Sequence, residues 1–238
     1  MKLMTFAAAA SAAFLFTSGA ATAATLLIDD FSTAQRVTDQ PDGVVGTSSE
    51  AAAGAALGGF RDLAVETDGT DPGDTTLNSN GTQLGFSNNV FASGRGWITY
   101  DGNDGDPLTV DTTGLGGIDF LIGGNPFMLF EVSTFESDLL VEITAWDMDG
   151  ETAFYSETLP PIGVFDPALP LAAFTLSDPL FDWTRVGALQ FYVQSTAPNY
   201  DGAITSISIQ AVPLPAPALM LLGGLAGFGL VGARRRKG

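Results

Sequence analysis

Cysteine and histidine are both absent from the 238 residues. Without cysteine the chain forms no disulfide and offers no thiol nucleophile. Without histidine it lacks the commonest nitrogen ligand for zinc and the usual general base, which excludes Ser-His-Asp and Cys-His catalytic systems. We therefore expect no catalytic residues and no enzyme. The one enzymatic chemistry left open is that of a carboxylate pair, as in glycosidases, for which Glu131 and Glu142 on adjacent predicted strands are an example.

Basic residues are few and unevenly placed: 9 Lys and Arg stand against 27 Asp and Glu, for a net charge of -18. Five of the nine lie at the chain ends. Between residues 24 and 211, four arginines against 27 acidic residues leave a formal charge of -23. Such a surface repels nucleic acid and anionic lipid, so we expect no nucleic-acid partner. Two interpretations of the acidic charge remain, namely the solubility of an exported protein and the binding of calcium.

Residues 1–23 have the pattern of a secretory signal peptide. Lys2 supplies a positive start, an apolar stretch runs from Phe6 to Phe16, and Ala21 and Ala23 form the A-x-A site that signal peptidase accepts. The apolar stretch is short for a membrane span, and a permanent amino-terminal anchor is the alternative. We expect Ala24 to be the first mature residue.

The carboxyl end, residues 212–238, has three parts in order. An extended, proline-containing motif is followed by an apolar run over about residues 216–233 and by a basic end over residues 234–237. A helix over the apolar run would reach about 27 Å, which barely matches a hydrocarbon core of about 30 Å. The basic end is expected to stay cytoplasmic, so that the body lies outside. Its residues are Arg234, Arg235, Arg236 and Lys237, and those of the motif are Val212, Pro213, Leu214, Pro215 and Ala216.

Residues 212–238 resemble the VPLPA variety of the PEP-CTERM sorting tails of Gram-negative bacteria. The resemblance implies that an exosortase, a membrane-embedded cysteine transpeptidase, recognises residues 212–216. It also implies a precursor held in the inner membrane and a product at the cell surface or in the extracellular matrix, in the setting of exopolysaccharide and biofilm production. A plain transmembrane helix that anchors the protein is the alternative.

Residues 24–211 predict one all-β domain, an antiparallel β-sandwich with a jelly-roll as the expected topology. Apolar and polar residues alternate with period two in several runs. The predicted strands are Leu26–Phe31, Phe60–Glu66, Thr82–Phe86, Trp97–Tyr100, Gly117–Ile122, Phe127–Val132, Val141–Trp146, Leu189–Gln194 and Ser206–Gln210. Phe127–Val132 is apolar on both faces apart from Glu131, which favours a central strand, and Asp147–Gly150 predicts a hairpin turn. Ser48–Leu57 predicts a short helix or a loop with equal weight.

The body also resembles galactose-binding-like jelly-rolls and related carbohydrate-binding modules. The segments that carry this resemblance are Leu27–Phe31, Asp182–Val186 and Tyr200–Ile204. Such folds often hold a structural calcium ion between the first and last strands, where Asp29 or Asp30 and Asp201 occupy comparable places. Ordinary turn chemistry is the alternative for these residues. Calcium is the only cofactor that the sequence suggests.

Other acidic groups are weaker candidates for a metal site. Asp101, Asn103, Asp104 and Asp106 share one loop, and Asp68, Asp71 and Asp74 share another, but neither matches the EF-hand spacing. Asp147, Asp149 and Glu151 are explained by the predicted hairpin turn.

Aromatic side chains are the candidates for glycan binding. The set comprises Trp97, Tyr100, Trp146, Tyr155, Trp183 and Tyr192. Trp146 and Tyr192 alternate with the apolar positions of their strands and are expected to face outward, where flat rings can stack on sugars. Packing in the core or across strands is the alternative.

The sequence thus predicts an exported, exosortase-processed, non-enzymatic protein of the cell surface or matrix, either structural or glycan-interacting. The alternatives are a carboxylate-based glycan-active enzyme and a calcium-dependent adhesin. Expected partners are signal peptidase, the exosortase, the membrane through the tail, and exopolysaccharide.

Overall fold

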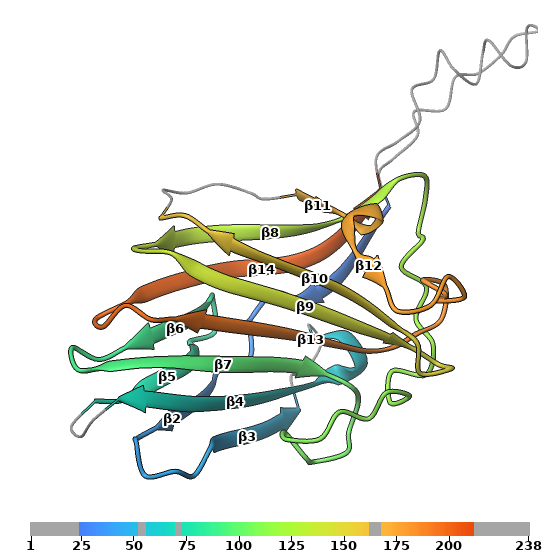
Figure 1. The fold of residues 1–238 in the computed structure, drawn as a ribbon. Helices are drawn as coiled ribbons and strands as arrows, with labels where there is room; N and C mark the ends of the chain where they lie inside the picture. The colour runs from blue at the N-terminus through green and yellow to red at the C-terminus, as the bar shows by residue number, and fades with distance from the viewer. Residues whose placement is uncertain (1–23, 52–55, 70–72, 162–167, 212–238) are drawn as a thin grey trace, which may run out of the picture. The chain divides into compact units, whose positions relative to one another are not determined.

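Two antiparallel β-sheets pack face to face in the computed structural model, which describes residues 24–51, 56–69, 73–161 and 168–211 (Figure 1). We call them sheet A and sheet B. Sheet A has the strand order β11-β8-β14-β6-β5-β2, with β1 also paired to β14. Its strands are β1 (Thr25–Asp29), β2 (Gln35–Asp39), β5 (Thr75–Ser79), β6 (Leu84–Asn88), β8 (Pro126–Phe135), β11 (Ala168–Pro170) and β14 (Asp201–Ala211).

Sheet B has the order β12-β10-β9-β13-β7-β4-β3 and forms the front layer in Figure 1. Its strands are β3 (Gly46–Ala51), β4 (Phe60–Gly69), β7 (Ala92–Tyr100), β9 (Leu139–Asp147), β10 (Thr152–Leu159), β12 (Thr175–Leu176) and β13 (Val186–Ser195). Two short 3-10 turns, η1 (Leu57–Gly59) and η2 (Leu171–Ala173), are the helical elements of the described residues. None of the described residues belongs to a helix with the length and apolarity to span a bilayer.

The chain passes between the two sheets many times. After β2 it forms β3 and β4 in sheet B, then β5 and β6 in sheet A, and it continues to change sheets until β14 closes sheet A. The all-β antiparallel sandwich predicted from the sequence is therefore confirmed. Repeated crossing is the connectivity that a jelly-roll requires, and the finer jelly-roll assignment stays a prediction.

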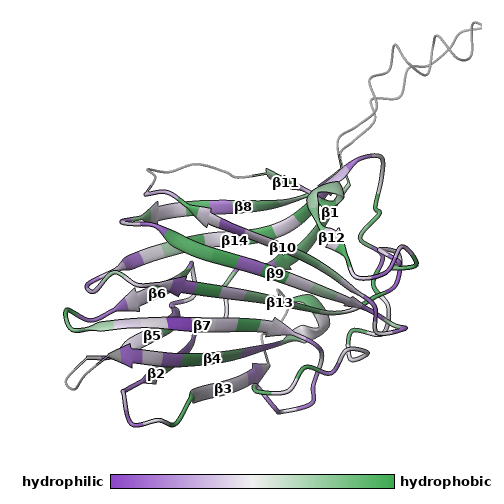
Figure 2. Ribbon diagram, viewed as in Figure 1, coloured by the Kyte–Doolittle hydropathy of each residue, from purple (hydrophilic) through white to green (hydrophobic). Residues whose placement is uncertain are grey.

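Alternation of residue types along the strands produces the core. In β2 and β6 every second side chain is buried, and Figure 2 shows hydrophobic and hydrophilic bands along the strands of sheet B. A strand with this period places one set of side chains between the sheets and the other on the outer face. Phe31, Tyr100, Phe120, Met128 and Leu189 are among the large side chains wholly enclosed in this way.

Most of the predicted strands are present, and the prediction for Asp147–Gly150 is confirmed. There the amide of Gly150 donates to the carbonyl of Asp147, and Gly150 has a φ of 88°. Phe127–Val132 falls within β8, which lies between β11 and β14, although Glu131 and not an apolar residue faces out of the sheet there.

Two predictions are wrong. Residues 117–122 form no strand, because Ile118 makes only an isolated bridge to Val186. Residues 48–51, expected in a helix or loop, belong to β3, which pairs with β4 along its whole length. β3 consists of Gly, Thr, Ser, Glu and Ala and has no large apolar side chain, so neither hydropathy nor alanine content indicated a strand there.

Candidate functional site

The outer face of sheet B carries cross-strand rows of polar and aromatic side chains. The register of the strands defines the rows, because residues directly opposite one another point to the same side. One row contains Ser156, Glu142, Tyr192, Trp97, Ala64 and Thr47. The next contains Phe154, Thr144, Gln190, Thr99, Asp62 and Ser49. The residues between them, such as Ile143 and Phe191, point into the core.

An aromatic pair lies at the middle of this face. Trp97 on β7 and Tyr192 on β13 are directly opposite, with ring centroids 5.4 Å apart and planes inclined by 56°. Both rings are half-buried, so each keeps part of its surface open to solvent. The Tyr192 hydroxyl donates to Oε1 of Gln194 at 3.0 Å, and burial raises the pKa of Tyr192. The pair therefore offers an apolar, uncharged platform.

Hydrogen-bonding groups flank the platform along the neighbouring positions. Gln190 donates from Nε2 to Oγ1 of Thr99 at 2.9 Å. Glu142, next to Tyr192, accepts from Oγ of Ser156 at 3.2 Å. These contacts use only part of the donor and acceptor capacity of each side chain. The remaining capacity is available to a polar ligand seated on the rings.

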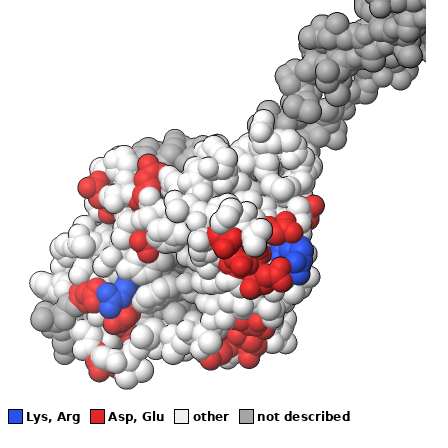
Figure 3. Space-filling view, turned by 45° about the vertical axis from the view of Figure 1, so that its right-hand side comes forward, with Lys and Arg blue, Asp and Glu red and all other residues white. Residues whose placement is uncertain are grey.

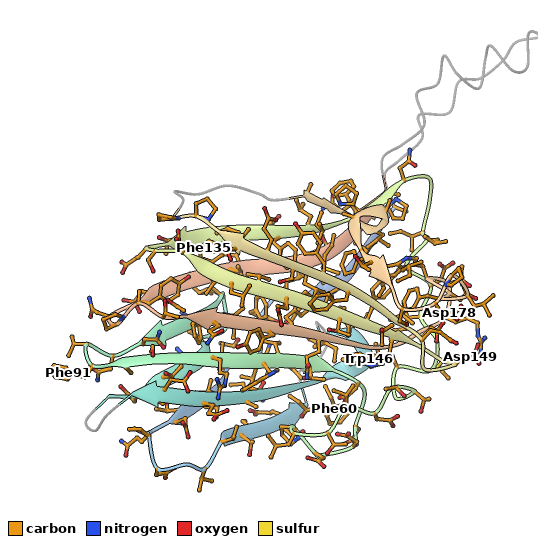
Figure 4. All side chains as sticks on the ribbon, in the orientation of Figure 1. Phe60, Phe91, Phe135, Trp146, Asp149 and Asp178 are labelled. Atoms are coloured by element: carbon orange, nitrogen blue, oxygen red, sulfur yellow. The ribbon has the colours of Figure 1, made fainter. Side chains whose placement is uncertain are left out.

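Trp146, the other predicted glycan residue, lies on the same face but at a distance from Tyr192. It is half-buried on β9 opposite Ala188, four residues along from the Glu142 that faces Tyr192. At about 3.3 Å per residue, this is roughly 13 Å along the strand. Figure 4 places Trp146 toward the end of the sheet where β4 begins at Phe60. Trp146 and Tyr192 thus lie on the same outer face of sheet B but are not in contact with each other.

Trp97 is the partner of Tyr192 that the sequence analysis did not single out. It was one of six aromatic candidates, and the parity that it shares with the polar residues Arg95 and Thr99 is the signal that could have marked it as outward-facing. Three of the other candidates belong to the core or its margin. Tyr100 is fully buried, Tyr155 packs on Phe174, and Trp183 packs on Phe120, Phe174 and Phe181.

Charge on this face is largely paired. Arg95 contacts Glu66 at 2.8 Å and Asp68 at 3.3 Å. The hydrogen bond with Glu66 raises the pKa of Arg95, which keeps it cationic. Figure 3 shows acidic side chains gathered in separate groups, with wide uncharged areas between them.

A second feature of sheet B is a compact group of three carboxylates, which we call the Asp62 cluster: Asp62, Asp101 and Asp104. Asp62 is on β4, and the other two follow β7. Each contributes an oxygen, and these oxygens lie within 4.8 Å of one another. Asp62 and Asp101 are each only 1% exposed, while Asp104 is exposed. Burial raises the pKa of Asp62, and it raises that of Asp101 to about 7.

The predicted calcium residues at the first and last strands do not come together, which corrects that grouping. Asp29 lies opposite Ile207 on β14, whereas Asp201 lies at the start of β14, roughly 20 Å further along the strand. The carboxylate of Asp29 forms an ion pair with Arg61 and accepts a hydrogen bond from the Tyr100 hydroxyl, each at 2.8 Å. Asp30 accepts from the amide of Ser32 at 2.9 Å in an exposed turn. The three carboxylates therefore share no single ion.

The carboxylate pair suggested for catalysis is also separated. Glu131 is exposed on β8 of sheet A, and Glu142 is on the outer face of β9 in sheet B. The two strands are consecutive in the chain but belong to different sheets. The core of the sandwich stands between the two side chains, which excludes a shared substrate.

The acidic turn at residues 147–151 is explained by its hydrogen bonds. Oδ1 of Asp147 accepts from the amides of Asp149 and Glu151, each at 3.0 Å, and its Oδ2 accepts from the amide of Asp182 at 3.0 Å. Asp149 is paired with Arg185 at 2.7 Å. Asp149 and Asp178 lie together at this end of the sandwich (Figure 4). These contacts leave Asp147 fully satisfied as a turn residue.

A cavity of about 140 Å³ lies between the sheets. Its walls are almost wholly apolar, and they include Leu77, Phe86, Phe130, Phe191 and Val193. Sugars need polar groups to fix their hydroxyls, and this cavity offers few. The outer face of sheet B remains the better candidate site.

The predicted sorting and cleavage residues lie outside the described residues. This applies to Ala21 and Ala23 of the signal peptide, to the motif Val212, Pro213, Leu214, Pro215 and Ala216, and to the basic end Arg234, Arg235, Arg236 and Lys237. Their assignments stay predictions from the sequence.

No protein-family model matches the chain, and no curated protein matches it. Several solved structures do. PfGH50B matches with a TM-score of 0.42 and 14% identity over 63% of this chain, which spans only 23% of PfGH50B. The agarase AgWH50C matches with a TM-score of 0.41 and 10% identity. The match covers 62% of this chain and 23% of the agarase. A family 11 carbohydrate-binding module from Clostridium thermocellum, solved with a β-1,3-1,4-mixed-linked tetrasaccharide, matches with a TM-score of 0.35 and 14% identity. The match covers 73% of this chain and 94% of the module.

Carbohydrate-binding modules are thus among the structures that this chain resembles. Because all three TM-scores lie below 0.5, the assignment of the fold rests on the strand order of the chain itself.

Proposed function

We propose that this protein is a non-enzymatic, exported protein of the cell surface or extracellular matrix that binds a neutral glycan on the outer face of sheet B. The observation that carries the proposal is the half-buried pair of Trp97 and Tyr192, flanked by side chains with hydrogen-bonding capacity. Pyranose rings present apolar C–H faces and a rim of hydroxyls, and this arrangement of aromatic and polar groups matches both.

The charge of the body supports a neutral ligand. Residues 24–211 carry a formal charge of -23, and the one arginine on this face, Arg95, is already paired with two carboxylates. An acidic polysaccharide would meet repulsion unless divalent cations bridged it. A neutral chain meets no such barrier.

A role without bond cleavage is supported by the chemistry of the face. The whole chain contains no histidine or cysteine, and Glu131 and Glu142 lie on opposite sheets. Exosortase processing and the biofilm setting rest on the ends of the sequence, residues 1–23 and 212–238. We include both in the proposal, because they state where the glycan-binding domain would act.

Binding to neutral polysaccharides tests the proposal. With the full-length protein purified in mild detergent, we expect retardation in affinity electrophoresis on gels containing neutral β-glucans. Replacing both Trp97 and Tyr192 with alanine should weaken binding at least tenfold, the equivalent of about 1.4 kcal/mol. Trp97→Phe, which keeps a ring, should retain most of it.

Phe91→Ala is the matched control, because Phe91 is also an exposed aromatic but lies in the loop between β6 and β7, away from this face (Figure 4). Thermal unfolding should show that all variants are folded. Unchanged binding in the double variant, or equal loss in Phe91→Ala, would rule out the platform. Absence of binding to every neutral glycan would leave a purely structural role.

A further inference from the structure

We propose that the Asp62 cluster binds a calcium ion, which holds the loop after β7 against sheet B. This site is separate from the aromatic pair and from the place between the first and last strands where the sequence suggested calcium. It is assembled by the register of β4 and β7. Asp62 is opposite Thr99, and Asp101 follows two residues later on the same face.

The unpartnered oxygens of this cluster are its decisive feature. Both carboxylate oxygens of Asp62 and the Oδ1 of Asp101 are buried and have no hydrogen-bond partner. Of the four carboxylate oxygens of Asp62 and Asp101, only Oδ2 of Asp101 is engaged, by the amide of Asp111 at 2.9 Å. Oδ1 of the exposed Asp104 accepts from the amide of Asp106 at 2.9 Å. Buried polar atoms in native proteins are nearly always paired, so three such atoms in one place point to a cation or a shared proton held between the two carboxylates.

The other buried aspartates of the described body show the contrast. Asp29 is met by Arg61, Tyr100 and a backbone amide, and Asp39 accepts from the amide of Thr67 at 2.7 Å. Asp147 accepts from three backbone amides. Buried carboxylates are therefore satisfied by protein groups elsewhere in this fold, and the two exceptions, Asp62 and Asp101, lie side by side.

Among the residues that the structure describes, no basic side chain is available to neutralise the cluster. The four arginines of residues 24–211 are all engaged elsewhere: Arg36 with Thr38, Arg61 with Asp29, Arg95 with Glu66 and Asp68, and Arg185 with Asp149. Placing two carboxylates out of water without a counter-ion is strongly unfavourable. A bound cation or a shared proton is required to offset that cost.

The chemistry of the cluster favours calcium as the ion. All the ligands are oxygens, and the chain has neither histidine nor cysteine to attract a softer metal. Ca²⁺ accepts six to eight oxygen ligands in an adaptable geometry, which suits two buried carboxylates completed by the exposed Asp104 and by water. Millimolar affinity suffices in an extracellular setting, where such sites have dissociation constants of about 10⁻⁴ to 10⁻³ M.

Calcium titration of EDTA-treated full-length protein in mild detergent tests the site. We expect calcium chloride to raise the midpoint of thermal unfolding and to bind with one-site stoichiometry in calorimetry. Asp62→Asn and Asp101→Asn should weaken calcium binding at least tenfold. Each should also unfold at or above the temperature of the calcium-free wild type, because a buried charge has been removed.

Asp149→Asn is the matched control, since Asp149 is an acidic residue of a different loop and is paired with Arg185. It should bind calcium as the wild type does. Asp104→Asn removes an exposed ligand with no buried role, so it reports on affinity even if the buried variants do not fold. A wild type that neither binds calcium nor gains stability from it overturns the proposal and assigns the cluster to a shared proton. Equal affinity in Asp104→Asn and Asp149→Asn overturns it as well.

Discussion

Arg61 is the most thoroughly buried charge of the described body, with 0% exposure, and its contacts join the two sheets. From β4 of sheet B it reaches Oδ2 of Asp29 on β1, Oε1 of Gln35 on β2 and the carbonyl of Thr33, each at 2.8 Å. Tyr100 of β7 donates to the same Asp29 oxygen. A polar network of this kind fixes how one sheet sits on the other, because each member has its partners in only one arrangement.

Removing Arg61 should be costly. In Arg61→Met the Asp29 carboxylate would stay buried without its counter-ion, and we expect a loss of about 3–5 kcal/mol in the free energy of unfolding. Urea denaturation followed by circular dichroism measures it. The double variant Arg61→Met, Asp29→Asn removes both charges and should recover part of the loss. If the double variant is the less stable of the two, the penalty does not come from the unpaired charge.

At the scale of elements, the segment between β7 and β8 is held by close backbone approaches. A Cβ built on Gly114 would lie 1.6 Å from the carbonyl oxygen of Asp101, and one on Gly102 would lie 2.6 Å from the carbonyl oxygen of Gly114. The amide of Leu115 donates to the carbonyl of Gly187 at 2.9 Å. Glycine at position 114 thus lets the loop fold back directly on Asp101, a member of the Asp62 cluster.

Alanine at position 114 should push the loop away from Asp101. We expect Gly114→Ala to cost about 1–3 kcal/mol of stability, as overpacking commonly does, and to lower calcium affinity together with stability. Gly85→Ala is the control, because its Cβ would have only ordinary contacts, the nearest at 3.7 Å. Calcium-dependent thermal unfolding of both variants measures the effects. Wild-type behaviour of Gly114→Ala would show that the loop accommodates a methyl group without moving.

Strands with apolar inner faces were predictable, and strands with polar inner faces were not. β9, β13 and β14 alternate clearly between apolar and polar residues, so period alone located them. β2 places Gln35 and Asp39 inward, where hydrogen bonds with Arg61 and Thr67 replace apolar contact. Hydropathy cannot reveal such a strand, because partners distant in the sequence make its burial favourable.

The candidate site, too, was only partly predictable from the sequence. Alternation correctly placed Trp146 and Tyr192 on the outer face of sheet B, since it depends only on neighbours in the chain. The contact of Tyr192 with Trp97 and the closeness of Asp62 to Asp101 depend on the pairing of β7 with β13 and β4. Register of this kind is set by the whole sandwich and cannot be read from either strand by itself.

At the scale of the whole chain, a strongly acidic body lies between two ends that the sequence assigns to export and sorting. If an exosortase recognises the motif, replacing both Pro213 and Pro215 with alanine should leave a full-length precursor in the membrane fraction. Proline is expected to matter because it keeps the segment extended. Immunoblots of fractionated cells measure the ratio of precursor to product, with Pro160→Ala, a proline remote from the motif, as the control. Processing at the wild-type rate in the double variant would favour a plain anchor.

The position of β14 has a consequence for the order in which the protein acquires its structure. This last strand lies inside sheet A, between β8 on one side and β6 and β1 on the other, so the first strand completes its pairing only with the last. A chain threaded amino-terminus first through a translocation channel therefore cannot finish sheet A until residue 211 has emerged. Such distant pairing makes folding slow. The delay would keep the polypeptide in the extended state that passage across a membrane demands, and would defer its compaction to the far side.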